Sequence, residues 1–214
     1  MKLKFSYNSP VILSYFFLCC AVLFFNDGMG APIMKYFTVY PDFDPSDPVN
    51  YFTLVSHICG HANAAHLLGN MMILLLVGPL MEERYGSRAV LAMILVTALV
   101  TGILVVLFFS KGLLGASGVV FMFITLSSFN NLKEGYIPLT FVIVFVMYVF
   151  KEILLELTVD DGVSHLAHIL GGSLGSLFGW KFNRKKNNDE EGKSTVHKSE
   201  TERTVPKSTG TPGS

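Results

Sequence analysis

Residues 91–109 read LAMILVTALVTGILVVLFF, an unbroken stretch without one acidic or basic side chain. An α-helix rises about 1.5 Å per residue, so this stretch is long enough to cross a hydrocarbon core about 30 Å thick. Hydrophobic residues make up 51% of the 214-residue chain, and they are concentrated in blocks of this kind. The composition excludes an ordinary soluble domain and predicts an all-α integral membrane protein.

Further apolar blocks flank this one on both sides, and together they predict a six-transmembrane-helix bundle. The predicted spans cover residues 5–26, 59–80, 89–109, 113–129, 137–155 and 163–180. We expect residues 27–52 to form a loop, rich in aromatic side chains, that lies in the membrane interface. A signal peptide is the competing interpretation of residues 5–26, because Lys2 and Lys4 precede them, but no convincing small-residue cleavage site follows.

Basic residues are distributed unevenly around the predicted spans. If both termini lie inside, the inner segments contain Lys2, Lys4, Arg84, Arg88, Lys133, Lys181, Arg184, Lys185 and Lys186. The outer loops then contain only Lys35 and Lys111, with Lys151 near the outer end of the fifth span. Because cytoplasmic loops are enriched in lysine and arginine, this contrast predicts that both termini are cytoplasmic.

Two regions differ in charge density. Residues 1–180 are predicted to form the membrane domain, whereas residues 181–214 carry 13 of the 32 acidic and basic residues. The tail beyond Asn183 is polar and lacks aromatic residues, so we expect a disordered cytoplasmic segment.

Polar residues cluster near the outer ends of three predicted spans. The second span opens with His57, His61, His66 and Asn70, the fourth with Ser117, and the sixth with His165 and His168. In the predicted topology all three spans run from outside to inside, which places these side chains at a similar depth. Polar groups within a bilayer are costly and usually face other helices or a cavity. We therefore expect them to form one site.

The motif Gly115-Ala116-Ser117-Gly118 suggests acyl-transfer chemistry at this site. A serine hydroxyl becomes nucleophilic when a neighbouring base takes its proton, and His168 is the candidate base. The oxyanion that forms needs preorganised donors, which the Ser117 backbone N–H, the Asn70 amide and the His66 ring could supply.

No acidic residue shares the depth of His168, since Asp160 and Asp161 lie in the preceding loop, and whether Asp161 or His165 assists His168 is left open. A Ser–His dyad is therefore expected in place of a triad.

Glycines flank the candidate nucleophile and follow the candidate base. Gly171, Gly175 and Gly179 recur every fourth residue after His168, and such a stripe lets another helix approach closely. The fourth span, with Gly115 and Gly118 beside Ser117, is the expected partner, and we expect the N–H groups around Gly115 to be free for an oxyanion.

Three other residues have secondary roles on this interpretation, and a fourth has none. His61 and His165 are expected to be structural, with His61 tying the aromatic loop to the second span, and His57 is expected to lie outside the membrane without a role. Phe121, one turn after Ser117, is expected to be a core residue whose ring could lie against His168.

These motifs are similar to those of the rhomboid intramembrane serine proteases. The matching pieces are His61-x4-His66-x3-Asn70-Met71, Gly78-x3-Glu82-x2-Tyr85-Gly86, Gly115-Ala116-Ser117-Gly118-Val119-Val120-Phe121 and Ala167-His168-Ile169-Leu170-Gly171-x3-Gly175. They occur in family order over roughly residues 50–180. The resemblance implies a six-helix core, Ser117 as nucleophile, His168 as base, and His66 and Asn70 in the oxyanion role.

The resemblance also implies a transmembrane protein as substrate, expected to be a single-pass protein, cut near the outer membrane face. No cofactor, metal or nucleic-acid partner is expected; the other partner is the lipid bilayer. The small size suggests a bacterial-type core in the cytoplasmic membrane. Two features depart from many family members: the first loop lacks a Trp-Arg pair, and Phe121 stands where a tyrosine is common.

Two alternatives remain open at this stage. The histidine cluster contains enough imidazoles for a zinc-dependent membrane hydrolase, although no acidic residue shares the layer to act as a base. The chain could also be a catalytically inactive binder of membrane clients, but such a protein would be expected to have lost Ser117 or His168. A transporter is less favoured, because the spans show no repeated pattern and no midplane acidic residue.

Overall fold

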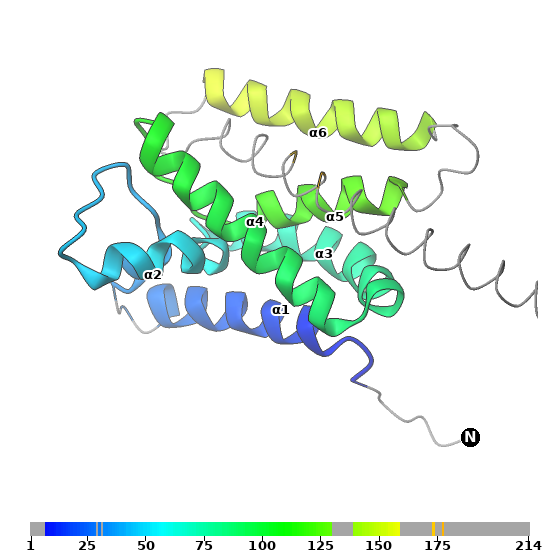
Figure 1. Ribbon diagram of the computed structural model, residues 1–214, viewed down its shortest axis with the longest axis horizontal. Helices are drawn as coiled ribbons and strands as arrows, with labels where there is room; N and C mark the ends of the chain where they lie inside the picture. The colour runs from blue at the N-terminus through cyan, green and yellow to red at the C-terminus, as the bar shows by residue number, and fades with distance from the viewer. Residues whose placement is uncertain are drawn as a thin grey trace, which may run out of the picture.

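The computed structural model describes residues 7–28, 30, 32–129, 139–158, 173 and 177, and its architecture is helical. The elements are α1 (Pro10–Leu23), the π-helix η1 (Phe24–Gly28), the 3-10 helix η2 (Met34–Phe37), α2 (Pro48–Ser56), the 3-10 helix η3 (His57–Cys59), α3 (Ala64–Tyr85), α4 (Ser87–Phe108), α5 (Ser117–Phe129) and α6 (Leu139–Thr158). Helices α1 and α6 lie on opposite sides of the bundle, and α5 lies between them in contact with α3, α4 and α6 (Figure 1).

Among the described residues, three helical segments are long and apolar enough to cross a membrane. They are Pro10–Gly28, Ala64–Tyr85 and Ser87–Phe108, and the shorter α5 is also apolar. The prediction of an all-α integral membrane protein is therefore confirmed. The count of six spans and the cytoplasmic location of both termini stay predictions, since residues 163–180 fall almost wholly outside the described part of the chain.

The segment between the first two spans is more ordered than a loop, so the prediction for residues 27–52 was wrong in part. Helix α2 begins at Pro48, where Asp47 accepts a hydrogen bond from the Val49 N–H at 2.9 Å. Aspartate at the N-cap followed by proline at the first helical position is a favourable helix start. The second span also begins later than predicted, at Ala64, because Asn63 caps it by accepting from the His66 N–H.

A buried carboxylate fastens α1 to α3. The two carboxylate oxygens of Glu82 accept the backbone N–H groups of Val11 and Ile12, each at 3.0 Å, and the Glu82 side chain is only 4% exposed. The first N–H groups of a helix have no partner within the helix, and the helix dipole favours a negative charge there. The charged neighbours Glu83 and Arg84 predict a surface cluster that would include Glu82, but Glu82 is buried against α1.

Replacing Glu82 with alanine should lower the melting temperature of the detergent-solubilised protein substantially. The change removes two charge-assisted hydrogen bonds and leaves two buried N–H groups without acceptors, a loss of about 2–4 kcal/mol. Thermal unfolding followed by circular dichroism would measure it. The matched control is Glu83→Ala, because Glu83 is the neighbouring carboxylate and is exposed; equal stability of the two variants would contradict the capping role.

Candidate active site

The turn that leads into α5 is held by hydrogen bonds from its backbone to Val39, His57 and His61. Leu113 exchanges two backbone hydrogen bonds with Val39, at 2.9 and 3.0 Å. The Gly115 N–H donates to the His57 carbonyl at 2.9 Å, and the Ala116 N–H donates to the His61 Nε2 at 3.4 Å. The expectation that the N–H groups around Gly115 are free was therefore wrong for Gly115 and Ala116. Their bonds define the path of the chain immediately before Ser117.

Gly115 brings the His66 ring next to the start of α5. Its φ is +121°, a backbone conformation that residues with a side chain rarely adopt. A β-carbon here would lie 2.9 Å from the His66 Cε1, 3.0 Å from its Nε2, and 3.8 Å from the Ser117 Oγ. The imidazole therefore packs on the bare Cα of Gly115, beside the serine hydroxyl. The sequence predicts that His66 and Ser117 lie at one depth, and the structure brings them both next to Gly115.

Three buried polar atoms lack a hydrogen-bond partner in the described part of the chain; one is the Thr97 Oγ1 of α4, and the other two belong to predicted site residues. These two are the Ser117 Oγ, in a residue that is 3% exposed, and the Asn70 Nδ2, one helical turn after His66. Leaving a buried donor or acceptor unpaired costs roughly 1–3 kcal/mol, so native structures seldom keep one without a function. An unpaired hydroxyl and an unpaired amide donor are the groups that a reacting carbonyl would need.

His61 is closer to the site than the sequence predicted. Its ring is fully buried and lies edge-on to the His66 ring, with 5.1 Å between the centroids. The Nδ1 lies 3.3 Å from the Cys59 carbonyl, which can only accept, while the Nε2 accepts the Ala116 N–H. These bonds require the Nδ1–H tautomer. His61 thus supports the turn before Ser117, where we had expected it to tie the aromatic loop to the second span.

His57 is buried in the structure, which the sequence did not predict. We expected it outside the membrane without a role, yet its side chain is 1% exposed. The Nδ1 donates to the Thr53 carbonyl at 3.0 Å, and the Nε2 lies 3.1 Å from the Thr101 Oγ1 of α4. The His57 carbonyl accepts the Gly115 N–H. His57 therefore connects α2 and α4 to the turn before Ser117. No local pattern in the sequence indicates this position, because His57 and His61 do not lie on one helix.

Phe121 lies in the core, as expected, and its neighbours come from α6. Its ring stacks on Tyr148 with 4.6 Å between centroids and 6° between planes, and it also contacts Phe145. The Tyr148 hydroxyl donates to the Ser117 carbonyl at 2.9 Å. Gly118 faces Thr101, whose Cγ2 would lie 3.6 Å from a β-carbon there.

The second half of the predicted site lies outside the described residues. This applies to the candidate base His168, to His165 and Asp161, and to the glycines Gly171 and Gly175. The close approach of the sixth span to Gly118 therefore stays a prediction. Within the described ranges no three His, Cys, Asp or Glu side chains gather as metal ligands.

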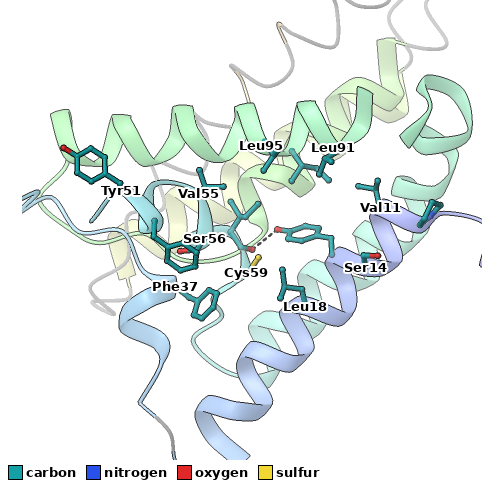
Figure 2. Close-up of a pocket in the computed structure, with 15 residues that line it drawn as sticks. Val11, Ser14, Leu18, Phe37, Tyr51, Val55, Ser56, Cys59, Leu91 and Leu95 are labelled. Carbon is teal, nitrogen blue, oxygen red and sulfur yellow. Dashed lines mark hydrogen bonds between the residues drawn. The ribbon is translucent and has the colours of Figure 1, made fainter. Parts of the chain in front are cut away.

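A separate cavity of about 820 Å³ opens between α1, α2 and α4 (Figure 2). Val11, Leu18, Val55 and Leu95 are among its lining residues, and the lining contains no histidine and no charged side chain. Ser117, His66 and Asn70 take no part in it. The cavity therefore offers neither a base nor an oxyanion site, and the arrangement around Ser117 is the candidate active site.

A comparison with known families matches the region of the chain that contains these residues. A family model described as Rhomboid domain matches residues 48–185, which include all the polar residues of the predicted layer. No curated protein gave a significant match. The match covers more than half of the chain and includes every motif on which the resemblance was based.

Proposed function

Because the chain belongs to the rhomboid family, we propose that it is an intramembrane serine endopeptidase that uses Ser117 to hydrolyse a peptide bond of a transmembrane protein. Members of this family generally are serine proteases that act on membrane-embedded substrates, and the apolar helices make this chain an integral membrane protein. The observation that carries the proposal is the buried Ser117 Oγ, without a hydrogen-bond partner in the described residues and beside the His66 ring.

In the proposed reaction the Ser117 Oγ attacks the scissile carbonyl carbon while His168 takes the hydroxyl proton. The carbonyl oxygen becomes an oxyanion, which the Asn70 Nδ2, the His66 ring and the Ser117 N–H stabilise by hydrogen bonds. The C–N bond then breaks as His168 returns the proton to the leaving amine. Water attacks the resulting ester as His168 takes a proton from it, and His168 then gives that proton to the Ser117 Oγ as the ester C–O bond breaks and the acid product leaves.

Asn70 is suited to the oxyanion role because its amide hydrogens are not engaged by the described residues. The donor is buried and held on a helix, so little reorganisation accompanies the reaction, and removal of one such donor typically costs 10²–10³-fold in rate. We further propose that the substrate is a single-pass protein cut near the outer membrane face. The charge asymmetry supports the position of the cut, because with cytoplasmic termini the polar layer would lie in the outer half of the spans.

A fluorophosphonate probe tests this proposal, because it phosphonylates only an activated serine. Protein in liposomes should be labelled at one site, and peptide mapping should place the adduct on Ser117. The same preparation should cleave a co-reconstituted single-pass substrate, with a cut located by mass spectrometry near the outer end of its span. An unlabelled, folded protein without cleavage would favour the inactive binder, whereas cleavage that a chelator removes would favour the zinc hydrolase.

A further inference from the structure

The helix that follows α5 contributes a hydroxyl group to the nucleophile's own peptide unit. Tyr148 of α6 is buried, and its hydroxyl donates to the Ser117 carbonyl at 2.9 Å. Ser117 and Tyr148 are 31 positions apart, so this bond joins two helices and is no part of either helical ladder. The hydrogen bond is made to the first residue of α5.

This contact restrains the geometry of the serine. The Ser117 carbonyl and the Gly118 N–H belong to one planar peptide unit, so a donor bound to that carbonyl resists rotation of the plane. A carbonyl oxygen has two lone pairs, and the tyrosine hydroxyl can use one while the helix uses the other. Rotation of this plane changes ψ of Ser117 and moves its Cβ and Oγ relative to the turn at Gly115.

The ring of Tyr148 packs against a side chain of α5, the helix that its hydroxyl contacts. Phe121, one turn after Ser117, stacks on it in a nearly parallel arrangement, with the centroids 4.6 Å apart. Phe145, one turn before Tyr148 on α6, contacts the same phenylalanine at 5.2 Å. The packing of these three rings therefore orients the Tyr148 hydroxyl, which donates a hydrogen bond to the Ser117 carbonyl.

We infer that Tyr148 is a positioning residue for Ser117, whose hydroxyl orients the nucleophile through the Ser117 carbonyl. The inference rests on the proposed function. It also accounts for the phenylalanine at position 121. Phe121 cannot donate a hydrogen bond, but its ring provides the surface on which a tyrosine from α6 brings a hydroxyl to the same turn of α5.

The test compares Tyr148→Phe with Tyr148→Leu in liposomes. The first variant removes only the hydroxyl and keeps the stacked ring, and the second removes both. We expect Tyr148→Phe to lower kcat and the fluorophosphonate labelling rate of the folded protein by about three- to tenfold, the equivalent of one hydrogen bond. KM should stay within about twofold, because the bond orients the nucleophile and does not bind substrate. Met147→Ala is the control, since Met147 is the adjacent residue and is 66% exposed.

The outcomes separate the possible roles of the residue. A normal labelling rate and kcat in Tyr148→Phe, with losses only in Tyr148→Leu, would overturn the inference and leave a packing role for the ring. A lower melting temperature with an unchanged labelling rate would overturn it as well. If the wild type itself does not react at Ser117, the proposed function fails and this inference fails with it. A reactive wild type with an unaffected Tyr148→Phe variant would overturn the inference alone.

Discussion

Replacing Ser117 with alanine should abolish cleavage of a transmembrane substrate, with kcat/KM at least about a thousandfold lower, and should leave the protein as stable as before. Loss of the nucleophile removes covalent catalysis altogether, because neither the oxyanion donors nor the base can replace the attacking atom. His168→Ala should cause a loss of similar size, since a serine hydroxyl without a base is a weak nucleophile.

The stability part of this prediction follows from the surroundings of the hydroxyl. The Ser117 Oγ is buried and makes no hydrogen bond within the described part of the chain. Its removal therefore breaks no hydrogen bond to these residues, and we expect a change in stability that is close to neutral. A serine kept for structure would behave in the opposite way, because its loss would leave a former partner unsatisfied.

Ser127→Ala is the matched control for this experiment. Ser127 lies on the same helix, and its hydroxyl donates to the Ile124 carbonyl at 2.8 Å. This variant should retain activity. The measurements are substrate cleavage in liposomes and thermal unfolding in detergent, made on both variants and the wild type. Undiminished cleavage by Ser117→Ala would exclude the dyad, and a large loss of stability would favour a structural role.

The sequence predicted the parts of the fold that follow from local patterns. Uninterrupted apolar runs of membrane-spanning length predicted the ends of α1, α3 and α4 to within about five residues, because the length of an apolar run is a property of one segment. The spacing of His66 and Asn70 by four residues predicted that they share a helix face. The positive-inside rule then predicted the common depth of these residues and Ser117 without any knowledge of contacts.

The sequence did not predict the positions of Glu82, His57 and His61, because these positions depend on contacts between distant segments. Glu82 lies among charged neighbours in the sequence, and its capping of α1 joins positions 70 and 71 residues apart. The burial of His57 requires α2, a helix of 9 residues that is too short to show a clear period. The bonds of His57 and His61 to the turn before Ser117 cross about 55 residues, and no local pattern encodes such a pairing.

Replacing Gly115 with alanine should lower kcat by roughly a hundredfold, the loss expected when one oxyanion donor is displaced. The new β-carbon would lie 2.9 Å from the His66 Cε1, a separation that real β-carbons essentially never show, and 3.0 Å from its Nε2, which is tighter than most such contacts. The His66 ring must therefore move away from the volume beside the Ser117 Oγ. The φ of +121° adds backbone strain of about 1–3 kcal/mol, which should also lower the melting temperature.

Gly86→Ala separates these two effects. Gly86 also has a positive φ, +81°, but a β-carbon there would meet no atom within 4 Å, and the residue lies at the other end of α3 from His66. The control should therefore lose stability without losing activity. Equal losses of activity in the two variants, measured on folded protein, would mean that backbone strain alone explains the effect of Gly115→Ala.

A double-mutant cycle with His66→Ala identifies the clash itself. In the wild-type background, Gly115→Ala both strains the backbone and displaces the His66 ring. In the His66→Ala background the ring is absent, so only the strain remains, and the second substitution should lower kcat by much less. Cleavage rates and melting temperatures of the four proteins give the coupling between the two positions. A coupling near zero would contradict the packing of His66 on Gly115 as the arrangement that holds the oxyanion donor beside Ser117.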